Sequence, residues 1–378
     1  MSNDFILQII TAILCFVSIL FAIFLLFVES KNKLGNRILA LFLIVRAIDA
    51  SVIIYINYIA VHPALDVFRH DAGGFLQLPL LFLFVLSIIY RDFRLKRKYL
   101  LLLIPFLLST LVAIPRYYLE YLGFRNSLFD GLPLSFEISF TYSLNFIQNL
   151  SLIVLTFVIL KRYKRIMMEN FSKTDNDNHR WLLQMNVISS FLFFAALIKN
   201  VHKYQENPQF IMQLRILVMT ISLLFICWLV FKALMAPKLF RGIDSSLQLV
   251  NVNDGPKLFE ETNESKLTLQ KIEKLKTYMD HKEPYLNPEL TIAELATELD
   301  INVTELSTLI NHHLSQNFHL FVNQYRIHKA KELLSDVSNN YNIQEILYKV
   351  GFNSKSSFNV SFKSLTGLTP SQYKNKTL

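Results

Sequence analysis

Hydrophobic and polar positions divide the chain into two unlike parts. From Phe5 to Ala236 long apolar runs follow one another, whereas the remainder is polar with short apolar repeats. A helix needs about 20 consecutive apolar residues to cross the hydrocarbon core of a bilayer. The pattern therefore predicts an all-α protein. It has a polytopic membrane domain at residues 1–238, a flexible polar linker at 239–266 and a C-terminal domain at 267–378.

Seven apolar runs predict a bundle of seven membrane-spanning helices. The third, fourth and sixth runs are short, and Pro79 and Pro105 fall inside the third and fourth. A proline removes one helical hydrogen bond, so neighbouring helices must satisfy the exposed backbone there. The runs are approximately Phe5–Val28, Ile38–Ala60, Gly73–Tyr90, Tyr99–Ile114, Ile138–Leu160, Trp181–Ile198 and Ile216–Ala236.

Lysine and arginine are distributed unevenly over the segments between these runs. About fourteen lie in one alternating set of segments and about five in the other. Cytoplasmic loops of membrane proteins are enriched in these residues. The richer set is therefore predicted to be cytoplasmic, which places the N-terminus outside and the C-terminal domain inside. The richer set is Lys31, Lys33, Arg37, Arg91, Arg94, Lys96, Arg97, Lys98, Lys161, Arg162, Lys164, Arg165, Lys173 and Arg180. The poorer set is Arg69, Arg116, Arg125, Lys199 and Lys203.

Two helix-turn-helix patterns occupy the C-terminal domain, at about 291–314 and 342–364. In the first, Ala296 falls where two helices approach closely and Asp300 falls at the turn, and in the second Gly351 makes the turn. Glycine adopts a left-handed turn easily, whereas aspartate adopts it at some cost. Apolar residues at helical spacing form the inward faces. They are Ile292, Leu295, Leu299, Ile301, Leu306, Leu309 and Ile310, then Ile343, Ile346, Val350, Phe358 and Phe362.

The two motifs, the amphipathic helix between them and the run GFNSKSSFNVSFKSLTGLTPSQY, which starts at Gly351, resemble the DNA-binding domain of the AraC family of bacterial transcription regulators. The resemblance covers the last quarter to third of the chain. It implies that one recognition helix from each motif enters successive major-groove segments of double-stranded DNA, and that RNA polymerase is a partner. Leu347 stands where the second motif of the family usually has alanine, so we expect that helix pair to repack around a larger side chain.

Carried over by position, the resemblance implies a set of polar side chains that contact DNA. Thr308 stands where the family often has arginine, which removes a strong reader of guanine. The second motif is the more basic, so we expect it to contribute most of the phosphate contacts. The candidates are Thr304, Ser307, Thr308 and Asn311 from the first recognition helix, and Ser354, Lys355, Ser356, Asn359 and Lys363 from the second.

Polar residues also interrupt the apolar runs. Arg46 and Asp49 lie three residues apart on one face of the second run, where either charge alone would be costly. They either pair with each other and fix helix packing, or form a ligand site inside the bundle, and the sequence leaves both readings open. Amide side chains in other runs can join such a site or link helices. They are Gln77, Asn145, Gln148 and Asn149.

The remaining chemistry points away from an enzyme, a cofactor or a metal site. Cys15 and Cys227 lie in apolar runs, and the histidines His312, His313 and His319 lack ligand spacing with either cysteine. The outer loops are too short to hold a folded sensor domain. An unknown small molecule or protein signal is therefore read by the bundle, by short loops or by a partner.

Together these features predict a sequence-specific transcription regulator in the lipid bilayer of the bacterial cytoplasmic membrane. A homodimer would raise its effective concentration on paired promoter sites. The alternative is a membrane receptor or transporter-like protein whose helical tail binds a protein partner.

Overall fold

The structure, a computed structural model, describes residues 2–30, 32–55, 58–59, 63–114, 135–172, 176–202, 208–235, 264–336 and 340–377. No strand occurs among these residues, and an isolated antiparallel β-bridge joins Phe171 to Thr291. The all-α fold is therefore confirmed. The chain forms two compact units. The first is Met1–Lys161 with Asp177–Ser246, and the second is Arg162–Asn176 with Leu247–Leu378.

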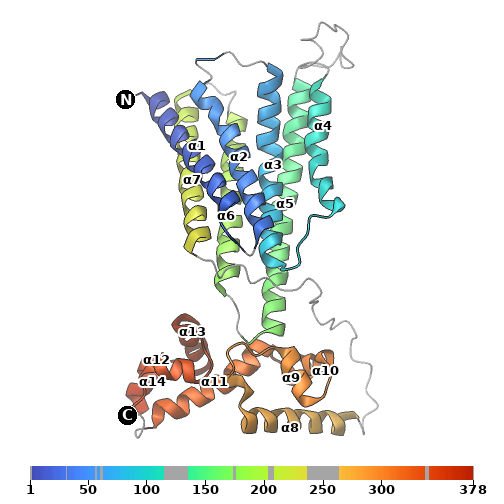
Figure 1. Ribbon diagram of the computed structural model, residues 1–378, viewed down its shortest axis with the longest axis vertical. Helices are drawn as coiled ribbons and strands as arrows, with labels where there is room; N and C mark the ends of the chain where they lie inside the picture. The colour runs from blue at the N-terminus through green and yellow to red at the C-terminus, as the bar shows by residue number, and fades with distance from the viewer. Residues whose placement is uncertain are drawn as a thin grey trace. The chain divides into compact units, whose positions relative to one another are not determined.

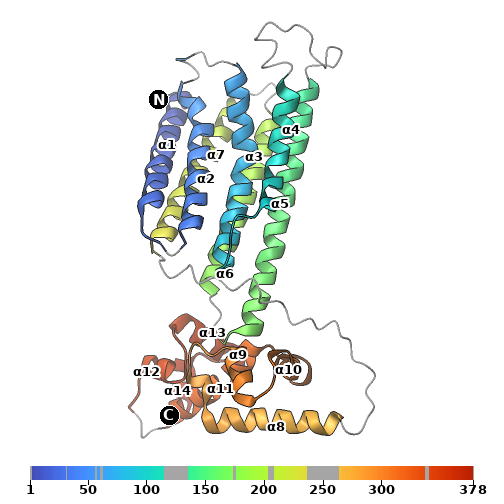
Figure 2. The ribbon, with the colours of Figure 1, turned by 45° about the vertical axis from the view of Figure 1, so that its right-hand side comes forward.

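Long helices lie side by side in the first unit, in both views (Figures 1 and 2). Helix α1 packs against α2 and α7, and α2 also packs against α3. Large apolar side chains such as Phe16, Phe27 and Leu224 remain exposed on the outside. The helices are α1 (Asn3–Phe27), α2 (Lys33–Tyr55), α3 (Pro63–Ile89), α4 (Ile104–Ala113), α5 (Ser135–Asn170), α6 (Asn176–His202) and α7 (Pro208–Met235).

Six helices in the described part of the chain are long and apolar enough to cross a membrane. The predicted fourth span, Tyr99–Ile114, is not one of them. It forms a 3-10 helix, η1 (Arg97–Leu103), followed by the ten-residue α4 with Pro105 in its first turn. Proline lacks the N–H and clashes with the carbonyl group four residues earlier, so it suits a helix start and not a helix interior.

The fourth segment nevertheless connects opposite ends of the first unit. Leu102 of η1 packs with Leu86, near the end of α3. Ala113, at the end of α4, lines a cavity together with Asp66 and Glu137, which lie at the N-terminal ends of α3 and α5. Seven 3-10 residues and ten α-helical residues together rise about 29 Å, close to the roughly 30 Å of a bilayer core.

The structure also bears on the start of the predicted third span and on the predicted linker. Helix α3 begins at Pro63, well before the predicted Gly73, so residues assigned to an outer loop are helical. The predicted linker, 239–266, lies outside the described residues up to position 263, and α8 begins at Glu264.

In the second unit, two apolar clusters are joined by one helix, α11 (Phe318–Ser335). Phe318 at its start belongs to the first cluster with Leu295, and Ile327 further along belongs to the second cluster with Leu347. The larger Leu347 is thus accommodated as a buried core residue. The other elements are α8 (Glu264–Lys282), η3 (Pro284–Leu286), α9 (Ile292–Leu299), α10 (Val303–Thr308), the π-helical η4 (Leu309–His313), α12 (Ile343–Lys349), α13 (Lys355–Thr366) and α14 (Pro370–Thr377).

Both predicted turns have the left-handed backbone that the sequence required. Asp300 has a φ of 54° and Gly351 a φ of 89°. At Gly351 space is also limiting, because an added Cβ would lie 2.6 Å from the carbonyl oxygen of Tyr285 and 3.0 Å from Nε of Arg326. Gly351 therefore permits the second motif to pack closely against η3 and α11.

Replacing Gly351 by alanine tests this close approach, and Gly367 supplies the control. Gly367 also has a positive φ, 76°, but an added Cβ would meet nothing within 4 Å. We expect Gly367→Ala to lower the free energy of unfolding of the C-terminal domain by about 1 kcal/mol through strain alone. Gly351→Ala should cost about 1–3 kcal/mol more because of overpacking. Urea denaturation of residues 264–378 measures both, and equal losses would contradict the packing argument.

Candidate functional sites

The first candidate recognition surface is formed by α10 and η4. Thr304 and Thr308 are exposed, and Oγ1 of Thr308 donates a hydrogen bond to the carbonyl oxygen of Thr304 at 2.9 Å. The carboxylate of Glu305 forms an ion pair with Lys271 of α8. This pair offsets the negative charge that would otherwise lie beside the two threonines.

Ser307 does not belong to this surface. Its side chain is fully buried, and its Oγ accepts a hydrogen bond from Nδ2 of Asn311 at 2.9 Å. Leu306 and Ile310 are also fully buried, so the inward face of the motif includes position 307 between them. The expectation of a DNA contact from Ser307 is therefore overturned by its burial. Asn311 is half-buried.

The second candidate recognition surface is the solvent-facing side of α13. Ser354 caps this helix, since its Oγ accepts a hydrogen bond from the backbone N–H of Ser357 at 3.2 Å. Phe358 and Phe362 are fully buried on the opposite side. The remaining predicted residues are exposed or, for Asn359, half-buried. They are Lys355, Ser356, Asn359 and Lys363.

The second unit is held together around one buried arginine. Arg326 of α11 is 2% exposed, and its guanidinium donates to the carbonyl oxygens of Tyr285 at 2.7 Å and Asn287 at 2.8 Å. It also donates to Oδ1 of Asn323 at 3.3 Å and to Oγ of Ser172 at 3.1 Å. Burial lowers the pKa of Arg326 to about 10, so the side chain still carries its charge at neutral pH.

Ser172 follows directly after α5 and belongs to this unit. Its backbone N–H donates to the carbonyl oxygen of Leu290 at 3.1 Å, and the preceding residue, Phe171, forms an antiparallel bridge with Thr291. Its side chain is 1% exposed. The segment Arg162–Asn176, which we call the α5 tail, is thus part of the same compact unit as both helix-turn-helix motifs.

His319 completes a ring of hydrogen bonds around the α5 tail. Nδ1 of His319 lies 2.7 Å from the carbonyl oxygen of Ser172, and a carbonyl only accepts, so Nδ1 carries the proton. Nε2 then accepts from Nδ2 of Asn323 at 3.0 Å. Asn323 also accepts a hydrogen bond from Arg326, and Arg326 donates to Ser172, so these four residues form a closed ring of hydrogen bonds. Burial lowers the pKa of His319, which favours the neutral imidazole that this arrangement requires.

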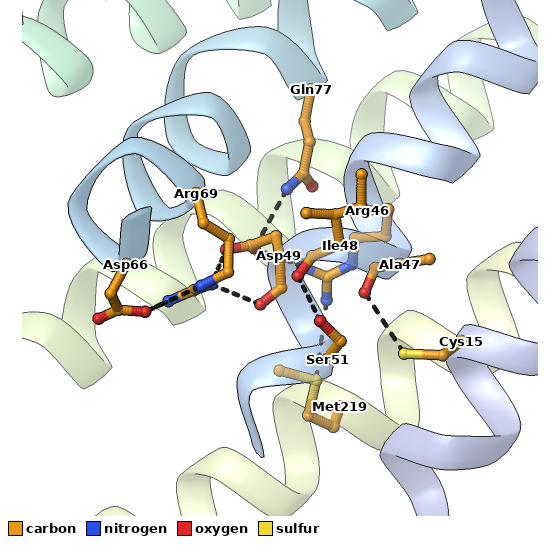
Figure 3. Close-up of polar contacts among 10 residues, drawn as sticks. All are labelled: Cys15, Arg46, Ala47, Ile48, Asp49, Ser51, Asp66, Arg69, Gln77 and Met219. Carbon is orange, nitrogen blue, oxygen red and sulfur yellow. Dashed lines mark hydrogen bonds and ion pairs between the residues drawn. The ribbon is translucent and has the colours of Figure 1, made fainter. Parts of the chain in front are cut away.

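In the first unit, Asp49 is the centre of a charged network (Figure 3). The predicted partner, Arg46, lies 3.5 Å from one of its carboxylate oxygens. Arg69 of α3 lies 3.1 Å from the other, and is itself 2.8 Å from Asp66. Gln77 donates to Asp49 at 3.3 Å. The arginine of α3 was missed because its position was assigned to a loop.

Five of the six predicted ligand candidates line one cavity, which we call the inner cavity. It has a volume of about 230 Å³ and lies among α2, α3, α5, α6 and α7. Gln148 is the exception, since its amide donates to the carbonyl oxygens of Phe75 and Leu102 and so joins neighbouring segments. The five that line the cavity are Arg46, Asp49, Gln77, Asn145 and Asn149.

A larger outer cavity of about 560 Å³ shares part of its wall with the inner one. His70 and Asp71 of α3 line both cavities, and the sequence reading missed them because they precede the predicted third span. The outer cavity reaches Asp4 and Glu137, at the N-terminal ends of α1 and α5. The described residues contain no group of three His, Cys, Asp or Glu side chains suited to a metal ion.

Comparison with known proteins concerns the second unit alone. A family described as a helix-turn-helix domain matches residues 295–376. An uncharacterized HTH-type transcriptional regulator of Bacillus subtilis (strain 168), YtdP, is 32% identical over 88 residues, which are 23% of this chain and 11% of that protein. The chain thus spans about a tenth of the length of this relative.

A solved structure is also similar to part of the chain. It is the C-terminal domain of AraT, a response regulator from Geobacillus stearothermophilus. The identity is 27%, and the match covers 28% of this chain and 84% of that one with a TM-score of 0.25. The family match and the regulator of Bacillus subtilis confirm the predicted helix-turn-helix domain at the C-terminus.

The buried His319 makes attachment of the α5 tail sensitive to acid. Because its pKa is lowered by burial, the folded unit binds fewer protons than the unfolded chain, and stability falls as pH drops below about 6.5. Protonated Nε2 can no longer accept from Asn323. We expect a peptide covering residues 162–176 to bind the domain at 264–378 more weakly at pH 5.5 than at pH 7.5.

Two variants provide the controls for this measurement. His319→Gln keeps one donor and one acceptor without a titrating group, so its peptide affinity should not change with pH. His328 is exposed, and His328→Gln should behave as the unchanged domain does. Equal pH dependence in the His319→Gln variant and the unchanged domain would contradict the assignment of the acid sensitivity to His319.

Proposed function

We propose that this chain, which ends in an AraC-type helix-turn-helix domain, is a membrane-bound, sequence-specific regulator of transcription. In this proposal the helical bundle receives a signal at the membrane and alters promoter binding by the second unit. The observation that carries the proposal is that α5 contributes to both units. Its residues up to Lys161 belong to the bundle, and those from Arg162 onward belong to the unit that contains both motifs.

Membrane insertion is supported by the apolar helices and by the distribution of basic residues. Arg91 follows the C-terminal end of α3 and Lys161 lies in the C-terminal half of α5, whereas Asp66 and Glu137 lie at the N-terminal ends of these helices. Under the positive-inside rule the basic ends are cytoplasmic. The N-terminus is then outside, and the second unit lies in the bacterial cytoplasm, where DNA is available.

DNA recognition is assigned chiefly to α13. Lys355 and Ser356 lie in the first turn of this helix, where unpaired backbone N–H groups and the helix dipole favour a phosphate. Asn359 lies one turn further along and has the amide that binds an adenine edge. Lys363 supplies a further phosphate contact. Ser354 acts as the helix cap and holds this first turn in place.

The first motif is assigned the smaller share of DNA recognition. Thr304 and Thr308 can contact thymine methyl groups or base edges, and Asn311 can bind adenine. No lysine or arginine lies within α10 or η4, so this motif contributes sequence preference more than electrostatic affinity. The lack of basic residues is also what favours the alternative, a tail that binds a protein partner.

Variants of α13 test the DNA contacts. We expect Asn359→Ala to cost about 1–3 kcal/mol of discrimination at one base pair. Lys355→Ala should weaken binding to all sequences and reduce the salt slope by about 1. Lys276, exposed on α8, is the matched control for loss of one positive charge. Gel-shift titrations of residues 264–378 over a range of salt measure these effects, and unchanged binding by both α13 variants would favour the protein-partner alternative.

A variant of the α5 tail tests the coupling between membrane and DNA. Ser172 is buried, so Ser172→Leu overpacks its site and should release the tail. We expect the DNA affinity of the full-length protein in lipid nanodiscs to shift toward that of residues 264–378. Allosteric coupling energies of about 1–3 kcal/mol predict a change of roughly 5- to 150-fold.

Ser335 is exposed at the end of α11, which makes Ser335→Leu the matched control. An unchanged DNA affinity of full-length Ser172→Leu would show that the tail transmits nothing to the DNA-binding surface.

A further inference from the structure

The two carboxylates that face the inner cavity differ in how they are satisfied. Asp49 is paired with Arg46 and Arg69 and accepts a hydrogen bond from Gln77. Asp71 is 4% exposed and accepts one hydrogen bond, from the hydroxyl of Ser109 at 2.7 Å. No lysine or arginine nitrogen in the described residues lies within 4.0 Å of the Asp71 carboxylate. A buried carboxylate without a cation is costly in an apolar bundle.

Two further buried polar atoms at this cavity have no hydrogen-bond partner. They are Oδ1 of Asn149 and Oγ of Ser189, whose side chains are 4% and 7% exposed. Nδ2 of Asn149 donates to the carbonyl oxygen of Gly74, which lies one helical turn after Asp71 on α3. Asp71 of α3 and Asn149 of α5 thus line the same cavity from neighbouring helices.

The outer cavity, which shares lining residues with the inner one, carries an acidic excess. Its wall contains five carboxylates and three lysine or arginine side chains. Such a wall attracts cations and repels anions. The carboxylates are Asp4, Asp49, Asp66, Asp71 and Glu137, and the basic residues are Arg69, Lys199 and Arg215.

Aromatic rings complete the inner wall. Phe75, Tyr142, Phe193 and Phe225 all line the inner cavity. The face of an aromatic ring attracts an organic cation, and more strongly when water is excluded. The same rings accommodate an apolar group, which suits a ligand that has one charged end and one hydrocarbon end.

We propose that the inner cavity binds a small organic cation, a protonated amine with an apolar body. The ammonium group pairs with Asp71 and donates to Oδ1 of Asn149, Ser189 contributes its hydroxyl, and the hydrocarbon part packs on the aromatic rings. The inference rests on the proposed sensor function, since it names the class of signal that the bundle receives. It explains why no lysine or arginine among the described residues pairs with Asp71, while the neighbouring Asp49 pairs with two arginines.

The experiment measures ligand binding to the full-length protein without DNA. Three probes of similar size differ in charge: phenethylamine as the cation, 3-phenylpropionate as the anion and 3-phenylpropanol as the neutral molecule. Thermal unfolding in detergent, followed by calorimetric titration, ranks their affinities. We expect the amine to bind at least tenfold more tightly than the other two, and binding led by the anion or absence of amine binding would overturn the proposal.

Variants assign this preference to Asp71. Asp71→Asn should reduce amine affinity at least tenfold, and Asp71→Glu should retain part of it. Glu29 is exposed and lines neither cavity, so Glu29→Gln controls for loss of one carboxylate. Equal amine affinity in Asp71→Asn and the unchanged protein would overturn the site assignment.

A second measurement covers the case in which Asp71→Asn does not fold. Ser109→Ala removes the hydroxyl that satisfies Asp71, so the amine should then raise the unfolding temperature more than in the unchanged protein. A smaller rise would overturn the proposal. The amine is tested without DNA, whereas promoter binding is tested separately by gel shift. A failure of amine binding is therefore distinguished from a failure of the proposed promoter binding.

Discussion

The burial of the Arg326 guanidinium is the constraint on which the second unit depends. Taking a charged group out of water costs several kcal/mol, even in the relaxed environment of a real protein. The chain offsets this cost with carbonyl and side-chain oxygens from three separate segments: the stretch after α8, helix α11 itself and the α5 tail. These segments therefore stabilise one another. Loss of one acceptor leaves a buried donor unsatisfied, which costs about 1–3 kcal/mol.

This requirement gives the α5 tail a role that sequence distance would not suggest. Ser172 offers its N–H, its carbonyl oxygen and its hydroxyl to different partners in the second unit. The partners lie at the start of α9 and on α11, which are the elements that support both motifs. A displacement of the tail would therefore break hydrogen bonds to Leu290, just before α9, and to His319 and Arg326 of α11.

The same physical rule, that buried polar groups need partners, organises the first unit. Glycines allow the necessary approach of the helices. A Cβ at Gly73 would lie 2.4 Å from Asp49, and one at Gly74 would lie 2.9 Å from Asn145. Where the rule is satisfied, as at Asp49, the network joins α2 to α3. Asp71 has a hydroxyl partner, Ser109, but pairs with no lysine or arginine in the described residues, and it lines the cavity.

Much of the fold followed from periodicity, and the departures have physical causes. The two turns at Asp300 and Gly351 were predictable because few residues suit a left-handed backbone. Ser307 was misplaced because the inward face of a helix is wide enough to include a polar neighbour of Leu306. Arg69 and Asp71 were missed because helix α3 extends beyond its apolar run. Contacts of Ser172 depend on residues more than a hundred positions away, and no local pattern encodes them.

The proposed coupling requires the α5 tail to stay attached to the rest of the second unit in the full-length protein. Phe171 and Thr291 are bridged, and opposed antiparallel residues have Cα atoms about 4.5–5.5 Å apart, within the range of a disulfide. The direct measurement is disulfide formation in full-length Phe171→Cys/Thr291→Cys in membranes, with Cys15 and Cys227 replaced by alanine. If the tail stays attached, we expect rapid and nearly complete cross-linking. Cross-linking no faster than in a mismatched Phe171→Cys/Thr297→Cys control would contradict it.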